Sequence, residues 1–486
     1  MDWAKYTDEG WYGNAAIRAH LTGHWYVAGD FNPAVAAPVW PFLEWGLFFF
    51  TGVKPEAARG LAIAAFILNL WLSYRLLRTS GSRWMALTAL TLVVTSPFLY
   101  CFSRLAILEP CLTALTLAAM NLAVRLPRFR RPVGIAACIG LVFAAMMLTK
   151  TTAIFLLPAL AWAMAVPLVS AKKPLLRCAA AAGAAFAAGY GAWMALIVRS
   201  GLLADYKYFF YINKYPRPSG ISWPLVSLWW SFHGGLWIDK ILTPLAGVLV
   251  LVALVFFRSL RGLWLDPVFG ASLLAAAGYI LFMTYQDHPQ PRYFALVAVF
   301  CFFVVARATE ALMESAAQSS VPRAAGWASV ALIVAATVVN GAQTLGYALH
   351  PQYTWVNAAA ELAHYIDTHP NGNRTLLSVS GDEIMLLTHL PALCDDFGTM
   401  ELPEKLAKYD PGWFASWNDL DPGTLADLHT GYSVEQVATF PALDDKERNR
   451  LILFKLHPLP GGERRDEGDL DMRVALPGDS FDAPIE

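Results

Sequence analysis

Charged residues are scarce in this sequence, and their scarcity excludes an ordinary soluble protein. Only 15% of the 486 residues are Asp, Glu, Lys or Arg, whereas a soluble domain has roughly 25%. Hydrophobic residues make up 57% of the chain. The formal net charge of -1 provides no basic field that would attract nucleic acid. We therefore expect a polytopic α-helical membrane protein.

Paired cysteines and metal-binding spacings are also lacking. Five of the six cysteines fall in or beside apolar runs, and only Cys394 lies in the C-terminal part of the chain. No CxxC or Cys/His spacing occurs, which argues against a disulfide framework and against a zinc site. The N-terminus does not have the pattern of a signal peptide.

Apolar segments long enough to cross a membrane recur along the first 350 residues, since a spanning helix needs about 20 residues. We predict ten spans, at 58–78, 83–102, 108–125, 133–149, 152–170, 178–198, 241–257, 265–285, 292–309 and 324–347. Five loops rich in Lys or Arg alternate with loops that are poor in them. The positive-inside rule puts the basic loops in the cytoplasm. The first 57 residues, the other loops and the C-terminal part are then extracytoplasmic.

This sidedness predicts an initiating transmembrane helix that the sequence does not contain, because nothing apolar precedes the first loop. The alternative is a chain whose N-terminus is truly outside. Pro38 to Val53 is apolar but short, and contains two prolines and Glu44. We expect this stretch to be an interfacial helix; if it spanned the membrane, every later loop would change sides.

The composition changes after about residue 350, where Asp, Glu, Asn, His, Gly and Pro become frequent. Helices are predicted at 355–367, 383–390 and 425–429, and strands at 375–379 and 451–456. The chain therefore divides into a first extracytoplasmic loop with interfacial helices (1–57), a helical bundle (58–347), a small soluble α/β domain (348–460) and a disordered tail (461–486).

Two acidic motifs lie in the predicted extracytoplasmic loops. Asp8 and Glu9 open a helical stretch, where acids complement the helix dipole and need no further role. Glu109 stands before Pro110 at the start of a span. Helix capping or an ion pair with Arg104 would explain Glu109, but an acid at a membrane boundary also suggests a functional group.

Two basic residues lie on the same side. Lys150 stands in a very short turn, where a snorkelling side chain is the simplest interpretation. Arg292 opens the ninth span and could pair with Asp287. Together, however, two acids and two bases meet at one face of the membrane. Acids suit proton transfer from an acceptor, and Lys and Arg suit binding of a phosphate.

In their order and spacing these motifs resemble the GT-C membrane glycosyltransferases, in particular the bacterial protein-mannosyltransferase-like and aminoarabinose-transferase-like branch. The resemblance covers most of residues 1–350. It is carried by Asp8-Glu9-x-x-Tyr12, the stretch Pro38 to Gly52 leading to Ala57-Ala-Arg59, Arg104-Leu-Ala-Ile-Leu-Glu109-Pro110, Leu148-Thr-Lys150 and Pro291-Arg292-Tyr293. Members of this family are bundles of eleven to thirteen spans that take sugar from a polyprenyl-phosphate donor, with inversion at the anomeric carbon.

The resemblance implies roles for individual residues. Asp8 would be the catalytic base, assisted by Glu9, and Glu109 would be the second acid. Lys150 and Arg292 would bind the donor phosphate. The remaining residues would line the pocket: Tyr12, Arg18, Arg104 and Tyr293.

Three departures from the family pattern are visible. The second acid is Glu109 where the family usually has Asp, Ala36 and Ala37 replace a basic residue that some members have, and the first span is missing. Some members use a divalent cation between the acids. Asp8, Glu9 and Glu109 are compatible with Mg or Mn but do not require either ion.

We therefore expect an inverting glycosyltransferase of the bacterial cytoplasmic membrane, with its C-terminal domain on the periplasmic side. Its partners would be a polyprenyl-phosphate sugar donor, a protein or lipid/glycan acceptor and membrane lipid. One alternative is a transporter or flippase of a lipid-linked saccharide, which should carry ionisable residues near the bilayer midplane. Another is a non-catalytic scaffold that uses the C-terminal domain for binding.

Overall fold

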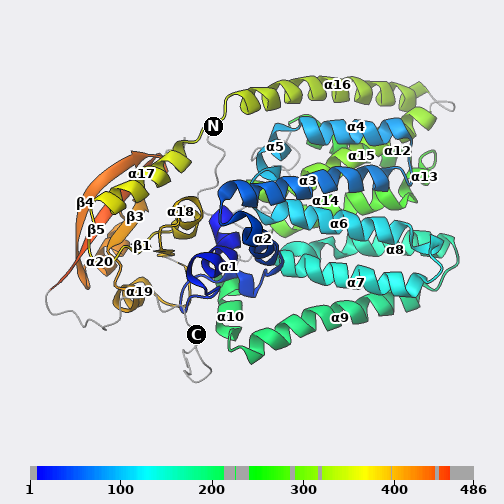
Figure 1. Ribbon diagram of the computed structural model, residues 1–486. Helices are drawn as coiled ribbons and strands as arrows, with labels where there is room; N and C mark the ends of the chain where they lie inside the picture. Colours follow the sequence, from blue (N-terminus) through cyan, green and yellow to red (C-terminus); the bar gives the residue numbers. More distant parts are fainter. Residues whose placement is uncertain are drawn as a thin grey trace.

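The computed structural model describes residues 8–212, 225, 240–284, 290–315, 320–395, 397–443 and 448–459. It consists of a bundle of roughly parallel and antiparallel helices and a smaller domain built around a β-sheet (Figure 1). Two helices, α1 (Asp8–Thr22) and α2 (Val39–Thr51), lie between the bundle and the smaller domain. The predicted interfacial stretch is therefore helical, as expected.

All ten predicted spans are helical. The helices of the bundle are α3 (Pro55–Leu77), α4 (Arg83–Thr95), α5 (Pro97–Ser103), α6 (Leu108–Val124), α7 (Pro132–Thr149), α8 (Leu157–Ser170), α9 (Leu175–Arg199), α12 (Leu242–Val255), α14 (Pro267–Met283), α15 (Phe294–Ser315) and α16 (Ser320–Leu349). Proline opens many of them, since its missing N–H costs nothing in the first turn. Shorter helices are α10 (Leu203–Ile212) and α13 (Arg261–Trp264).

Six helical segments of the described chain are long and apolar enough to cross a membrane unaided. The predicted span 83–102 is not one straight helix, because α4 and α5 meet at an angle of 71°. Ser96 has an extended backbone and its side chain caps the amide of Leu99, while Pro97 cannot continue the preceding helix. This pair makes a seventh span if counted as one, and α6, α12 and α14 are shorter apolar helices.

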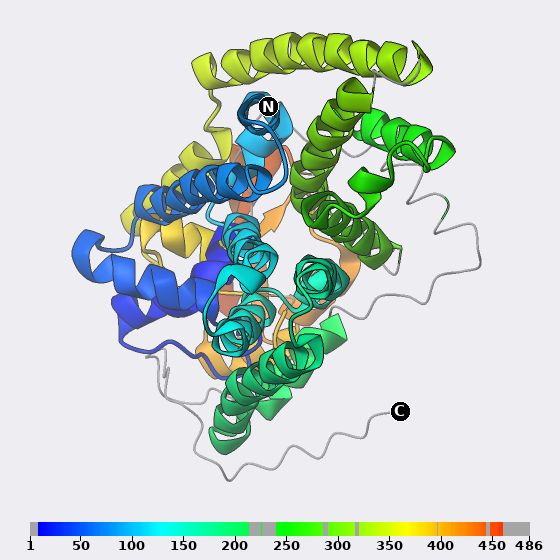
Figure 2. The ribbon, with the colours of Figure 1, turned by 90° about the vertical axis from the view of Figure 1, so that its right-hand side faces the viewer.

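The core of the bundle is centred on α15. About 83% of the apolar window of this segment is buried inside the protein, against only 6% for α9. A helix that is apolar yet exposed needs a lipid environment, so α9 lies at the periphery and faces the membrane. The view along the bundle in Figure 2 shows the helices packed around one another, with α9 at the lower edge. The central position of α15 fixes the place of its first residues and of the turn that precedes them.

The smaller domain has a five-stranded mixed sheet in the order β2-β1-β3-β5-β4. Its strands are β1 (Leu376–Leu377), β2 (Ala392–Leu393), β3 (Trp413–Trp417), β4 (Tyr432–Pro441) and β5 (Arg450–Pro458). β1 is parallel to β2 and β3, and β5 is antiparallel to β3 and β4. The sequence predicted only β1 and β5, and it overestimated the length of β1.

Helices cover both faces of this sheet. α17 (Thr354–Thr368) and α18 (Gly381–Thr388) pack on one face, and α19 (Leu402–Tyr409) and α20 (Pro422–Leu428) on the other. The core on the α17–α18 side continues without a break into α1, α2 and the start of α6. The smaller domain is therefore packed onto the end of the bundle through α1. The tail 461–486, predicted to be disordered, lies outside the described residues.

Candidate functional site

Asp8 and Glu9 are adjacent in the first turn of α1, but they bind different partners. The carboxylate of Asp8 meets the guanidinium of Arg292 at 2.5 Å. Glu9 instead accepts two hydrogen bonds from Arg59 of α3, at 2.6 and 2.9 Å, and one from the backbone amide of Ala106. Glu9 therefore fastens α1 to α3 and to the turn before α6, and only Asp8 faces the basic residues of the predicted site.

Arg292 belongs to a short 3-10 turn, Pro291–Tyr293, that leads into the central helix α15. Besides binding Asp8, its guanidinium donates a hydrogen bond to the Tyr12 hydroxyl at 3.3 Å and lies 5.1 Å from the Tyr293 ring. Burial raises the pKa of Tyr12, so its hydroxyl stays protonated. The arginine thus binds Asp8 and lies against two aromatic rings.

Glu109 and Lys150 complete the group. Glu109 lies in the first turn of α6, and its carboxylate accepts a hydrogen bond from the Lys150 ammonium, just after α7. The ammonium also sits 4.2 Å above the Tyr293 ring, and Arg292 Nε is 3.8 Å from the same Glu109 oxygen. Lys150 is buried rather than snorkelling to the surface. These four charged residues are called the Asp8–Arg292 cluster: Asp8, Glu109, Lys150 and Arg292.

The Asp8–Arg292 cluster is nearly buried but not saturated. Its side chains are between 2% and 9% exposed. Among the described residues, neither Glu109 Oε2 nor Arg292 Nε has a hydrogen-bond partner. Buried polar atoms are normally paired, so these two atoms mark a place where a polar ligand could bind.

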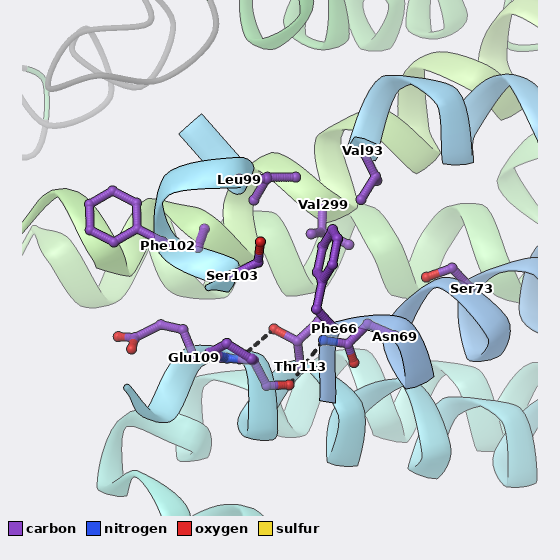
Figure 3. Close-up of a pocket in the computed structure, with 12 residues that line it drawn as sticks. Phe66, Asn69, Ser73, Val93, Leu99, Phe102, Ser103, Glu109, Thr113 and Val299 are labelled. Carbon is purple, nitrogen blue, oxygen red and sulfur yellow. Dashed lines mark hydrogen bonds between the residues drawn. The ribbon is translucent and has the colours of Figure 1, made fainter. Parts of the chain in front are cut away.

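A small cavity of about 30 Å³ lies behind Glu109, between α3, α4, α5, α6 and α15. Figure 3 shows that the Glu109 carboxylate points away from this cavity, while the carbonyl groups at the start of α6 are held by Asn69 and Thr113. The volume is that of roughly one water molecule. The cavity is therefore too small for a substrate.

Of the two other predicted pocket residues, Arg18 points to the smaller domain. Arg18 is fully buried and binds Asp30 at 2.6 Å and Asp382 at 2.8 Å, so it connects α1 with the smaller domain instead of facing the Asp8–Arg292 cluster. Arg104 lies over the Tyr100 ring at 5.6 Å. Asp287, the alternative partner of Arg292, lies outside the described residues.

The three candidate metal ligands do not converge. Glu9 is engaged by Arg59, while Asp8 and Glu109 both contact Arg292. In the part of the chain that the structure describes, no three His, Cys, Asp or Glu side chains are grouped to hold a metal ion. In this arrangement the acids neutralise cationic side chains, so the donor set does not fit a shared Mg or Mn ion.

Sequence reasoning missed the residues that fix α1. Asp30, Asp382, Glu383 and Lys405 are all buried at the contact between α1 and the smaller domain. The only available signal was the acidic pair Asp382-Glu383 at a helix start, which repeats the pattern of Asp8-Glu9. Their partners are more than 360 residues away, so spacing gave no indication of the contact.

Comparison with known proteins identifies the fold. No protein-family model and no curated protein sequence matches this chain. Among solved structures, ArnT from Cupriavidus metallidurans in the apo state matches with a TM-score of 0.58 at 13% identity, over 92% of this chain and 93% of that one. ArnT bound to undecaprenyl phosphate gives 0.57 at 14% identity, over the same shares of the two chains.

A more distant enzyme matches as well. The apo oligosaccharyltransferase of Archaeoglobus fulgidus has a TM-score of 0.53 at 13% identity, over 92% of this chain and 72% of that one. These identities are low, so the comparison concerns the fold. The chain is a multi-pass membrane protein with an ArnT-like form of the GT-C glycosyltransferase fold, as its sequence motifs predicted.

Proposed function

We propose that this protein is an inverting glycosyltransferase that moves a sugar from a polyprenyl-phosphate donor to a protein or lipid/glycan acceptor. The observation that carries the proposal is the Asp8–Arg292 cluster, in which two acids hold two cations, and in which two buried polar atoms have no hydrogen-bond partner within the described part of the chain. The fold supports it, because ArnT of the same fold binds undecaprenyl phosphate in one of its structures.

The donor phosphate would bind where the cluster holds its cations. Lys150 and Arg292 are both cationic, and Arg292 can bind two phosphate oxygens at once. Phosphate would compete with Asp8 for the guanidinium. The free Asp8 carboxylate would then be available as a base, so donor binding and activation of the base are coupled.

The reaction follows from these positions. Asp8 removes the proton from the acceptor nucleophile, whose lone pair attacks the anomeric carbon opposite the phosphate. The bond between that carbon and the phosphate oxygen breaks, and polyprenyl phosphate leaves with the bonding electrons. Lys150 and Arg292 stabilise the charge that develops on this phosphate. Glu109 would hold Lys150 and Arg292 in place throughout.

An apolar groove of the helical bundle offers room for the isoprenoid chain. It has a volume of about 440 Å³ and lies between α12, α14 and α15, with an almost wholly apolar lining that includes Val250, Ile280 and Val304. Thr284, just after α14, lines this groove, and the 3-10 turn with Arg292 is the next described element in the chain. A lipid donor could thus place its chain in the groove and its phosphate at the cluster.

The location follows from the basic loops. We propose that the protein lies in the bacterial cytoplasmic membrane with the smaller domain and the site on the periplasmic side. α1 and the smaller domain lie at the same end of the bundle (Figure 1), and the Lys- and Arg-rich loops alternate with those at this end. Ser433→Cys, at an exposed position of β4, should react with a membrane-impermeant maleimide in cells with a permeable outer membrane. Protection of that cysteine until the inner membrane is lysed would reverse the orientation.

The function is tested by transfer of labelled sugar from a panel of polyprenyl-phosphate sugars in membranes that contain the protein. Transfer should depend on the protein and should be lost in Asp8→Asn at an unchanged protein level. Asp367→Asn is the matched control, since this acid forms an exposed ion pair with Arg374 far from the cluster. Protein-dependent movement of intact donor across the bilayer without sugar transfer would instead identify a flippase.

A further inference from the structure

Two neighbouring acids of the smaller domain bind one face of α1. Glu383 Oε2 accepts a hydrogen bond of 2.6 Å from the backbone amide of Gly10. Asp382 binds the Asn14 amide at 3.2 Å and the Arg18 guanidinium at 2.8 Å. Gly10, Asn14 and Arg18 are spaced four residues apart and so lie on one face of the helix.

The hydrogen bond to Gly10 replaces a helix cap. The first amides of an α-helix have no partner within the helix, and a side-chain oxygen usually accepts from one of them. Here Glu383 provides this oxygen from a position 373 residues away in the chain. It therefore fixes the first turn of α1, which also contains Asp8.

The backbones at this contact are unusually close. A Cβ atom at Gly10 would lie 2.2 Å from the backbone nitrogen of Glu383 and 2.3 Å from the carbonyl carbon of Asp382. Any other residue would push α1 away from α18. Both acids are almost completely buried, and the apolar core continues across the same contact through Ala16, Ile17 and Ile384.

We propose that Asp382 and Glu383 are positioning residues of the catalytic site, so that the smaller domain sets the place of Asp8. This inference rests on the proposed function, in which Asp8 is the base. The smaller domain is then a working part of the site, in addition to any role in binding the acceptor. A small displacement of a catalytic group is enough to slow a reaction by about 100-fold.

The protonation of Glu383 determines which variant is conservative. Burial raises the pKa of Glu383 well above its usual value, and the Glu9 carboxylate raises it further. Both effects favour the neutral acid, which glutamine matches in shape and charge. Burial also raises the pKa of Asp382 to about 6, although Arg18 opposes the shift.

The test compares Glu383→Ala with Glu383→Gln in the full-length protein. We expect Glu383→Ala to lower kcat by about 10- to 100-fold with little change in the KM for the donor. Glu383→Gln should keep kcat within a factor of about two, because its amide oxygen still accepts from Gly10. Glu404→Ala, an exposed acid in the first turn of α19, is the matched control.

A second variant reaches the same contact without removing an acid. Gly10→Ala should lower kcat as Glu383→Ala does, whereas Gly46→Ala, where a Cβ atom would meet open space, should not. Wild-type kcat in both Glu383→Ala and Gly10→Ala would overturn the proposal. An equal loss in Glu383→Gln and Glu383→Ala would overturn it too, since the hydrogen bond is kept in the first.

A readout without catalysis separates this proposal from the proposed function. Hydrogen exchange in the peptide that contains Gly10 should be faster in Glu383→Ala than in the wild type and unchanged in Glu383→Gln. If no donor supports transfer by the wild type, the proposed function fails, and the exchange data still show whether Glu383 fixes α1. Equal exchange in all three proteins would contradict the positioning role.

Discussion

Two groups of four buried charges lie on either side of α1, and they differ in how completely they are closed. The Asp8–Arg292 cluster contains two acids and two bases with side chains up to 9% exposed. The second group, here called the Arg18–Asp382 cluster, consists of Arg18, Asp30, Asp382 and Lys405, whose side chains are 0% exposed. The two clusters therefore have the same charge composition but differ in exposure.

The partners of each cluster explain this difference. In the Arg18–Asp382 cluster, Lys405 also donates to the backbone carbonyls of Cys394 and Phe397, and Asp30 accepts from the Cys394 amide. Backbone contacts of this kind close the cluster and join α1 to the smaller domain. The Asp8–Arg292 cluster instead borders aromatic rings and, among the described residues, leaves Glu109 Oε2 and Arg292 Nε without a hydrogen-bond partner, whereas the other cluster leaves only Arg18 Nε. The first arrangement suits stability and the second suits binding.

Arg18→Met should have the largest effect on stability. It leaves the carboxylates of Asp30 and Asp382 buried with one cation fewer, which costs about 3–5 kcal/mol. Thermal unfolding in detergent should show a clearly lower midpoint. Adding Asp382→Asn should recover part of the loss, because one unpaired charge is then removed. A wild-type midpoint in Arg18→Met would mean that this cluster does not hold the domain.

Arg292→Met should affect function more than stability. Loss of a donor to a developing charge slows transfer by about 10²–10³-fold, and we expect weaker binding of undecaprenyl phosphate as well. The unfolding midpoint should change less than in Arg18→Met, because this site is partly open. Equal loss of stability in Arg18→Met and Arg292→Met, with phosphate binding kept in both, would show that the two clusters have the same role.

Glu9→Gln separates the two neighbouring acids of α1. Glu9 makes two hydrogen bonds to Arg59, and hydrogen bonds to charged groups are worth about 1.5–3 kcal/mol each. We expect a moderate drop in the unfolding midpoint with measurable transfer remaining, in contrast to the complete loss in Asp8→Asn. Complete loss of transfer in Glu9→Gln at normal stability would give Glu9 a direct catalytic role.

Glu44→Gln should have the smallest effect, and it should be stabilising. Glu44 is buried against Gly13 of α1, and burial raises its pKa well above the usual value near 4.5. The native protein then binds a proton that the unfolded chain releases. The stability from this group is complete below about pH 4.5 and is lost as pH rises toward the folded-state pKa.

The substitution should therefore raise the unfolding midpoint at pH 8 and have almost no effect at about pH 4, below the unfolded-state pKa. The gain should be roughly 1 kcal/mol, the lower end of the cost of burying an unpaired polar group. A midpoint that falls equally at both values of pH would show that the carboxyl group itself is needed at the contact between α1 and α2.

The sequence was sufficient for the bundle and for one cluster, for identifiable reasons. A long apolar run can only be a buried or membrane-spanning helix, so all ten segments were found. Lys150 and Arg292 were conspicuous because they stood alone at the ends of such runs. The bend at Ser96 was not predicted because α4 and α5 are both apolar. Hydropathy does not show a change in the direction of the helix axis.

The Arg18–Asp382 cluster could not be predicted in the same way. Arg18 was visible, but its partner Asp382 is 364 residues away and belongs to a different domain. β2 has only two residues and β4 carries an irregular register between Gln436 and Ala438, so neither gave a clear alternating pattern. Contacts between distant segments depend on tertiary packing. The spacing of apolar residues along the sequence predicts local helices and strands, but not which of them pack together.

Competition between Asp8 and a lipid phosphate for Arg292 can be measured as binding of undecaprenyl phosphate to the purified protein. Asp8→Asn should bind undecaprenyl phosphate more tightly than the wild type, because the guanidinium then loses its nearer carboxylate and keeps only the more distant Glu109, and it should transfer no sugar. Weaker or unchanged binding in Asp8→Asn, or normal transfer, would contradict the account.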